Sequence, residues 1–205
     1  FAAYLKIPGL EVASASPERF LSRDGAKILT SPIKGTMRWN EEDFGEKDKA
    51  ENLMIVDLMR NDLGKICADG SVEVSELFRT EVHPGLTHLV SDVRGNLREG
   101  VKWREIFDAL TPAGSVSGAP KSSALKIISE NESAPRGVYC GAIGWIEGER
   151  AELAVGIRTF WKGEDSLVRF GTGAGITWGS DPVSEWEETQ LKAEKLIALA
   201  GGEVK

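Results

Sequence analysis

Three glycines recur at every second position in Gly171-Thr-Gly-Ala-Gly175-Ile-Thr-Trp178, directly after a strand-like run that ends at Phe170. Because glycine has no Cβ atom, this backbone can adopt positive φ and lets a ligand touch its amide groups. A helical pattern follows, in which Glu185 and Glu188 share one side near the start, while Glu187 points away. Glycine backbone beside two carboxylates suits an anionic small molecule held through a metal ion. Acidic residues also favour any helix N-terminus, so this stretch alone leaves both interpretations open.

The composition indicates a globular protein, with 205 residues, 41% of them hydrophobic and 28% charged. The net charge is −7 and no basic stripe is present, so we expect no nucleic-acid partner. No apolar run is long enough to span a bilayer, so we expect no membrane association either. Cys67 and Cys140 lack metal-ligand spacing and a disulfide framework, which is typical of the cytoplasm. Because the chain starts at Phe1 within a strand-like run, we expect it to be the carboxyl-terminal portion of a longer chain.

Short strands separated by turns dominate the first third, including a hairpin at Asp24-Gly25. The strongest helical pattern runs from Ala50 to Leu63 and is closed by Gly64 as a C-cap. Its core-facing positions are Met54, Ile55, Leu58 and Met59. Strand pairs interleaved with helices, without regular β-α-β alternation, predict an α+β fold with largely antiparallel sheets. We find no internal boundary, so residues 1–205 are interpreted as one domain.

Lys34 is the sharpest single feature, since it stands between Pro32 and Gly35 on backbone that we expect to be stiff and exposed. A lysine there could clamp an anion or act as an amine nucleophile. A solvated surface lysine is the commoner case.

Glu51 lies on the polar edge of the 50–63 helix. It could join Glu185 and Glu188 around Mg²⁺, which prefers carboxylate oxygens and fills its remaining positions with water and substrate. A helix-surface glutamate explains it equally well.

Polar side chains interrupt three apolar runs that we predict as strands, at His88, Tyr139 and Arg158. A guanidinium inside a strand requires an anion, either a substrate carboxylate or an internal glutamate. His88 could carry protons or be a satisfied core histidine. Ser115 precedes a helix that begins near Lys121, where free amides could hold a carboxylate, although a plain capped helix start fits as well.

Taken together, these features resemble the chorismate-utilising enzymes, most closely their aminodeoxychorismate synthase component I branch. The matching stretches occur in the family's order across nearly the whole chain. They are Ser16-Pro-Glu-Arg-Phe20, Pro32-Ile-Lys-Gly-Thr36, Ala50-Glu-Asn-Leu-Met-Ile-Val-Asp-Leu-Met-Arg-Asn-Asp-Leu63, Thr87-His-Leu-Val-Ser91, Gly114-Ser-Val-Ser-Gly-Ala-Pro-Lys121, Tyr139-Cys-Gly-Ala-Ile-Gly144, Gly156-Ile-Arg-Thr159, Gly173-Ala-Gly175 and Glu185-Trp-Glu-Glu-Thr189.

The resemblance implies a chorismate-binding fold of two packed, largely antiparallel sheets flanked by helices, here without its N-terminal part. It implies Mg²⁺ held by Glu51, Glu185 and Glu188. It implies that the substrate is contacted by Ser115, Tyr139, Arg158, Gly173 and Gly175. His88 matches the family histidine near the leaving group, and Glu18 is expected to exchange protons with Lys34.

Within this resemblance, Lys34 distinguishes aminodeoxychorismate synthases from anthranilate synthases, because anthranilate synthases generally carry alanine at this position. The implied reaction converts chorismate and ammonia to 4-amino-4-deoxychorismate, a precursor in the para-aminobenzoate branch of folate synthesis. The ammonia would come from a glutamine amidotransferase subunit or domain. The alternatives are anthranilate synthase component I and a non-catalytic fragment that docks the amidotransferase. One departure is the 37–49 segment, which is shorter than in the family and has Met37-Arg38-Trp39 in place of Arg-Pro-Arg.

Overall fold

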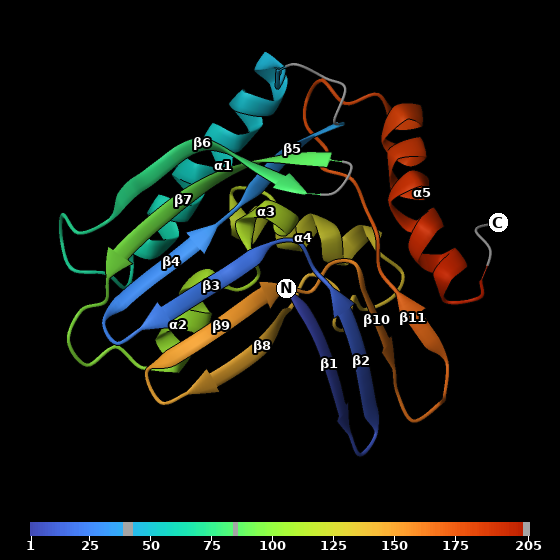
Figure 1. Ribbon diagram of the computed structural model, residues 1–205, viewed down its shortest axis with the longest axis horizontal. Helices are drawn as coiled ribbons and strands as arrows, with labels where there is room; N and C mark the ends of the chain where they lie inside the picture. Colours follow the sequence, from blue (N-terminus) through green and yellow to red (C-terminus); the bar gives the residue numbers. More distant parts are fainter. Residues whose placement is uncertain (39–42, 84–85, 203–205) are drawn as a thin grey trace.

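Two antiparallel sheets form the framework of the computed structural model, which describes residues 1–38, 43–83 and 86–202 (Figure 1). The smaller sheet has the order β1 (Ala2–Ile7), β2 (Leu10–Ala15), β10 (Thr159–Lys162) and β11 (Val168–Phe170). The larger has the order β5 (Ile33–Arg38), β7 (Leu86–Asn96), β4 (Lys27–Ser31), β3 (Arg19–Asp24), β9 (Arg150–Val155) and β8 (Ala142–Glu147), with β6 (Glu73–His83) also paired to β7. The predicted α+β class with antiparallel sheets is confirmed.

The chain from β4 to β5 behaves as one long strand that is broken at Pro32. β4 pairs with the carboxyl-terminal half of β7 and β5 with its amino-terminal half. Between them the Pro32 carbonyl accepts a hydrogen bond from the Ser91 amide (3.2 Å). The register then shifts between Ile33 and Thr36, where Gly35 has φ +85°. This bulge turns Lys34 out of the regular alternation, as bulges beside functional sites commonly do.

Five helices lie in the described residues: α1 (Glu46–Gly64), α2 (Trp103–Leu110), α3 (Gly114–Ser117), α4 (Lys121–Asn131) and α5 (Pro182–Leu199). α1 crosses one face of the larger sheet (Figure 1), and Ile55, Val56, Met59 and Leu63 are its buried apolar residues. Burial of each such side chain contributes about 1.5–3 kcal/mol.

The prediction for this helix is wrong in two details. Met54, which was predicted to face the core, is 52% exposed, and Val56 is buried instead. Gly64 is the last helical residue, and the cap is Lys65 with φ −71°, so no left-handed glycine ends the helix. The 37–49 segment noted above lies partly outside the described residues.

The chain changes sheets at Arg158, where one continuous strand was predicted. β9 ends in the larger sheet, β10 begins in the smaller one, and Arg158 between them has φ +50°. The run around Tyr139, which was also predicted to be a strand, is instead a turn from Gly137 up to the start of β8. A backbone hydrogen bond joins the turn before β8 to the segment between β9 and β10, because the Gly156 amide donates to the Gly141 carbonyl (2.7 Å). A Cβ atom on Gly156 would lie 2.3 Å from the Val138 oxygen, so this approach requires glycine.

Tyr139 therefore lies in the connection between α4 and β8, and Arg158 in the connection between β9 and β10. The prediction that they lie inside strands is wrong. His88 does lie within a strand, β7.

The carboxyl-terminal helix α5 is the least buried of the long helices. Ala193 is its one buried residue. Leu191 on this helix is 62% exposed. None of the described helices is long and apolar enough to cross a membrane.

A buried ion pair joins three helices near the site. The Asp62 side chain, 1% exposed at the end of α1, accepts from Lys121 Nζ (2.7 Å) and Lys65 Nζ (2.7 Å). Lys121 also donates to the carbonyls of Ala109 and Leu110 at the end of α2. Since Lys121 opens α4, this one carboxylate fixes α1, α2 and α4 relative to one another.

Replacing Asp62 by asparagine should lower the free energy of unfolding by about 3 kcal/mol, because the half-buried Lys121 ammonium loses its charge partner. Urea denaturation measures this. Asp57→Asn is the matched control: it removes an exposed pair with Arg60 (2.8 Å) on the same helix and should cost less than about 1 kcal/mol. Equal losses in the two variants would contradict a structural role for the buried pair.

Candidate active site

Lys34 reaches from the β5 bulge into a polar cluster built from several separate segments. Its Nζ lies 3.4 Å from the Ser115 carbonyl oxygen in α3. The Ser115 hydroxyl donates to Oε1 of Glu18 (2.6 Å), which precedes β3. A Cβ atom on Gly175 would lie 3.8 Å from Lys34 Nζ. The structure thus brings together Lys34, Glu18, Ser115 and Gly175, and Lys34 is not a plain surface lysine.

Glu18 is 6% exposed, and burial raises the pKa of its carboxyl to about 7. The Ser115 hydroxyl and the positive charge of Lys34 act in the opposite direction, since both stabilise the carboxylate. A carboxyl that titrates near neutrality can both accept and return a proton, which is what proton exchange with a neighbouring amine requires.

The glycine-rich stretch is occupied by Tyr139. Cβ atoms on Gly171 and Gly173 would lie 2.3 Å from Cγ and 2.8 Å from the hydroxyl of that side chain. Neither these two glycines nor Gly175 is among the glycines with positive φ. The absence of Cβ atoms therefore permits close approach, as expected, but the group that approaches is a tyrosine of the same chain.

His88 is buried without a partner. It is 2% exposed, and neither ring nitrogen has a hydrogen-bond partner among the described residues. Burial lowers the pKa of His88 to about 4, with the positive charges of His83 and Arg158 acting in the same direction. The ring is therefore neutral at pH 7, with one nitrogen as donor and the other as acceptor, both buried and unpaired among the described residues. The alternative of a satisfied core histidine is not what the structure shows.

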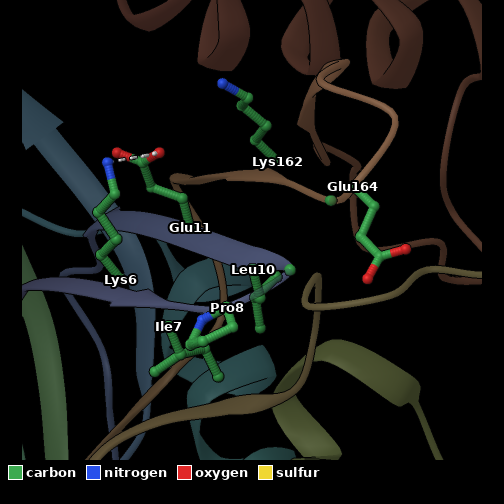
Figure 2. Close-up of a pocket in the computed structure, with 9 residues that line it drawn as sticks. Lys6, Ile7, Pro8, Leu10, Glu11, Lys162 and Glu164 are labelled. Carbon is green, nitrogen blue, oxygen red and sulfur yellow. Dashed lines mark ion pairs between the residues drawn. The ribbon is translucent and has the colours of Figure 1, made fainter.

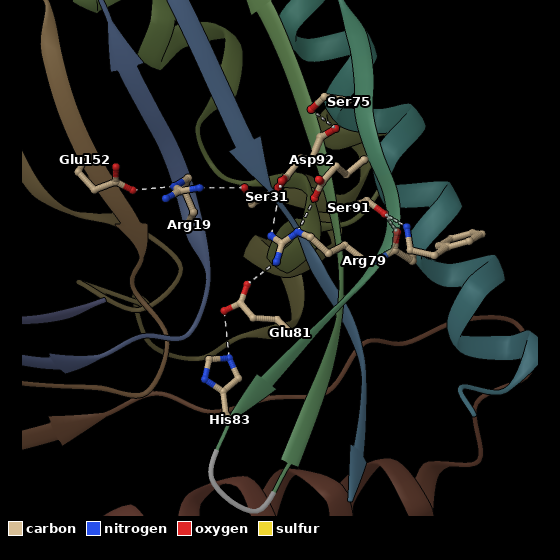
Figure 3. Close-up of polar contacts among 12 residues, drawn as sticks. Arg19, Ser31, Ser75, Arg79, Glu81, His83, Ser91, Asp92 and Glu152 are labelled. Carbon is tan, nitrogen blue, oxygen red and sulfur yellow. Dashed lines mark hydrogen bonds and ion pairs between the residues drawn. The ribbon is translucent and has the colours of Figure 1, made fainter. Parts of the chain in front are cut away.

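A chain of charged groups runs along β6 (Figure 3). Arg79 pairs with Glu81 (2.9 Å), and the other oxygen of Glu81 lies 3.0 Å from Nε2 of His83. The His83 ring lies 5.1 Å from the His88 ring. Glu81 is thus engaged by Arg79 and His83, although it is the cross-strand neighbour of His88.

Among the described residues no charged group shifts the pKa of Arg158, and burial lowers the pKa of its guanidinium. A half-buried cation of this kind calls for an anion. The internal glutamate that was one alternative is not found among the described contacts of Arg158.

The three carboxylates expected at the metal each have a local partner. Glu51 lies 3.8 Å from Lys47, Glu188 lies 2.6 Å from Lys192, and Glu185 accepts from the Ser180 hydroxyl (2.6 Å). Helices α1 and α5 both begin at the upper edge of Figure 1. Within residues 1–38, 43–83 and 86–202, however, no three His, Cys, Asp or Glu residues are grouped to hold a metal ion. The donor chemistry suits Mg²⁺, but these side chains are not gathered into a site.

A surface hollow lies elsewhere (Figure 2). It measures about 620 Å³ and is lined by the β1–β2 turn from Lys6 to Glu11 together with residues 162–164. None of the predicted site residues lines it. Because it is an open surface depression at a hairpin tip, we place the candidate site at the Lys34 cluster, where the chemistry converges.

The model of chorismate binding enzymes matches residues 1–198. The chain belongs to the chorismate-binding enzyme family. Anthranilate synthase component 1 of Aquifex aeolicus is 42% identical over 95% of this chain and 42% of its own length. Aminodeoxychorismate synthase of Streptomyces pristinaespiralis is also 42% identical, over 97% of this chain and 29% of its own.

Among solved structures, anthranilate synthase component I from Streptococcus pneumoniae superposes with a TM-score of 0.86 at 35% identity, over 96% of this chain and 46% of that one. This family member therefore spans less than half the length of these relatives. The suspected family and fold are confirmed, and two differently named activities are represented at equal identity.

Sequence reasoning missed Asn52, which is fully buried beside Glu51 in α1. Its Nδ2 donates to the Leu89 carbonyl (3.3 Å) and its Oδ1 accepts from the Ser91 hydroxyl (2.5 Å). It thereby ties the helix to β7 next to His88. An amide inside the apolar 50–63 pattern was the available signal, since a buried amide must find partners.

Glu18→Gln should change how stability depends on pH. Below about pH 4.5 the parent carboxyl is protonated in both states. Between 4.5 and 7 the unfolded carboxyl ionises while the folded one stays protonated, so the parent loses up to about 3 kcal/mol as pH rises. The glutamine variant should lack this loss. Urea denaturation at a series of pH values measures it, with exposed Glu130→Gln as control; parallel profiles for parent and Glu18→Gln would contradict the assignment.

Proposed function

We propose that the chain is the chorismate-binding catalytic region of an aminodeoxychorismate synthase component I, which converts chorismate and ammonia to 4-amino-4-deoxychorismate. The observation that carries this proposal is the placement of Lys34. Its amine lies beside Ser115, Glu18 and Gly175, in a cluster with a carboxyl group that could exchange protons with it. Sequence identity alone favours neither aminodeoxychorismate synthase nor anthranilate synthase.

Lys34 and Glu18 would perform the central chemistry. The free amine of Lys34 adds to C2 of the chorismate ring, the ring double bonds shift, and the C4–oxygen bond breaks. The proton lost by the amine passes to Glu18, whose pKa of about 7 lets it accept at neutral pH. Ammonia then adds at C4 and expels the lysine nitrogen from C2, so Lys34 is regenerated with the proton that Glu18 returns.

The remaining residues would bind and orient the substrate. Arg158, a half-buried cation, suits the enolpyruvyl carboxylate. The Tyr139 hydroxyl, which lies against Gly173, and the amides of Gly173 and Gly175 would bind the substrate as well. His88 would bind the departing C4 oxygen through its neutral ring, since both of its nitrogens lack protein partners among the described residues. Ser115 would hold Glu18 and Lys34 in register.

Magnesium is part of the proposal through Glu51, Glu185 and Glu188. When bound, Mg²⁺ supplies electrostatic stabilisation of the ring carboxylate. The Lys47–Glu51 and Glu188–Lys192 contacts are largely exposed pairs within single helices, and such pairs contribute little stability. Their lysines could therefore release the carboxylates to an ion without much cost.

A glutamine amidotransferase is the proposed source of ammonia. The names of the component 1 relatives imply a second component, and the chain itself offers no residue that we assign to releasing ammonia from glutamine.

The product identifies the activity. Incubating the protein with chorismate, Mg²⁺ and ammonium should yield aminodeoxychorismate without pyruvate, as resolved by mass spectrometry and a pyruvate assay. Anthranilate with pyruvate would overturn the proposal in favour of anthranilate synthase. No turnover of chorismate would favour the docking-fragment alternative.

Lys34→Ala should lower aminodeoxychorismate formation by at least about two orders of magnitude, because it removes the nucleophile. Lys34→Arg is the informative companion, since it retains the positive charge without an amine that can attack. Both variants should be impaired in steady-state turnover, while chorismate binding measured by calorimetry is largely retained in the arginine variant. Normal turnover of Lys34→Arg would show that charge alone suffices.

Glu51→Gln and Glu188→Gln should each weaken Mg²⁺ binding at least about tenfold, because each removes a negatively charged oxygen ligand. Calorimetric titration of Mg²⁺ in the presence of chorismate measures this without an activity assay. Glu187→Gln is the matched control on the same turn of α5, and its affinity should equal that of the parent. Equal affinities in all four proteins would place the ion elsewhere.

A further inference from the structure

Arg136 makes contacts to three separate parts of the chain, in the connection between α4 and β8. Its Nε and Nη2 donate to both oxygens of Glu132, at 2.9 and 2.6 Å. Its Nη1 donates to the Val116 carbonyl in α3 (3.3 Å) and lies 3.3 Å from the Cys140 sulfur. The guanidinium also lies over the Tyr139 ring, 5.5 Å from its centroid.

These contacts connect the two sides of the candidate site. Val116 follows Ser115, which holds Glu18 and faces Lys34. Cys140 follows Tyr139, whose ring packs on the Gly171 and Gly173 backbone. Arg136 therefore touches both the nucleophile side and the tyrosine side of the candidate site.

The turn that carries Tyr139 needs such support. Cys140 has φ +64° and Gly137 has φ +60°. A left-handed conformation is uncommon for a residue other than glycine and persists only where its surroundings enforce it. The Cys140 amide is held by the Gly156 carbonyl (2.9 Å), and its side chain is held by Arg136.

We propose that Arg136 is a positioning residue, which fixes Tyr139 and Ser115 relative to each other so that the site is formed before substrate arrives. The proposal rests on the proposed function, in which both residues face chorismate. Glu132 fixes the direction of the guanidinium through two oxygens, which leaves Nη1 for Val116 and Cys140. Only a planar, forked group can make these contacts together.

Arg136→Lys tests this directly, because lysine keeps the positive charge beside the thiol but loses the fork. The first readout needs no substrate. The chain has two cysteines, both buried, and iodoacetamide labelling of each is followed by peptide mass spectrometry. We expect Cys140 to be labelled about tenfold faster in the variant through local opening, and Cys67, in the hydrophobic core, to be unchanged.

The second readout is the Kd of chorismate by calorimetry in the presence of Mg²⁺. Arg136→Lys should raise it about tenfold, the equivalent of one lost charge-assisted hydrogen bond. In a Tyr139→Phe background the same substitution should raise Kd by a clearly smaller factor, since residues that act through one another are not additive. Arg60→Lys, which alters an exposed arginine–aspartate pair, is the control and should change neither readout.

Faster labelling of Cys140 alone, together with weaker chorismate binding, supports the proposal. Equal acceleration at Cys67 and Cys140 would overturn it in favour of general destabilisation. Faster Cys140 labelling with unchanged Kd, or no change at Cys140, would also overturn it. Chorismate that binds but is not converted to aminodeoxychorismate by the parent would contradict the proposed function alone, whereas a parent that does not bind chorismate would end both.

Discussion

Strand β7 is the constraint on which the site depends, because it is paired along both edges. β6 lies along one edge, and β4 and β5 share the other. A strand held in this way cannot slip by one residue without turning His88 from its buried face. The same ladder forces the extra residue of β5 into a bulge, so that Lys34 leaves the sheet toward α3. The positions of the proposed nucleophile and the neutral histidine thus follow from one set of backbone hydrogen bonds.

Burial then determines the protonation of the groups that this framework brings inside. It raises the pKa of Glu18 to about 7 and lowers that of His88 to about 4. Glu18 has Ser115 and Lys34 to offset part of the desolvation, whereas neither His88 nor Arg158 has comparable support among the described residues. Unpaired buried polar groups cost free energy in the protein alone. In the proposed function, the anionic substrate would supply the missing partners.

Local sequence patterns predicted those parts of the fold that depend on neighbouring residues. The helix predicted from Ala50 to Leu63 and the hairpin at Asp24-Gly25 are both present, as periodicity and turn chemistry indicated. The change of sheet at Arg158 was not, because it depends on the approach of Gly156 to Gly141, fifteen residues away in the sequence. The strands predicted around Tyr139 and Arg158 were therefore extended across turns that interrupt them in the structure.

The candidate site shows the same division. Lys34, Glu18, Ser115 and Gly175 could be named from motifs, and the structure brings them together. The role of Arg136 could not be predicted from motifs, because its contacts to Val116 and Cys140 exist only once α3 and the 137–141 turn are adjacent. The carboxylates proposed to bind the metal show the opposite case. Glu188 forms an ordinary i,i+4 pair with Lys192, so a local interaction occupies a side chain whose proposed metal role also depends on Glu51 in α1.

Whole-chain similarity and reaction chemistry are separable in this protein. Relatives named as anthranilate synthase and as aminodeoxychorismate synthase are equally similar to it, which is expected if both activities use the same binding framework. The difference between them then has to reside in a few side chains that touch the reacting atoms. Lys34 carries the one amine in the cluster, so in the proposed reaction it alone could form and break a bond to the substrate ring, and the bulge at Gly35 gives it access that no regular strand position would provide. The specific reaction proposed for this chain therefore depends on one side chain and on the backbone irregularity that presents it.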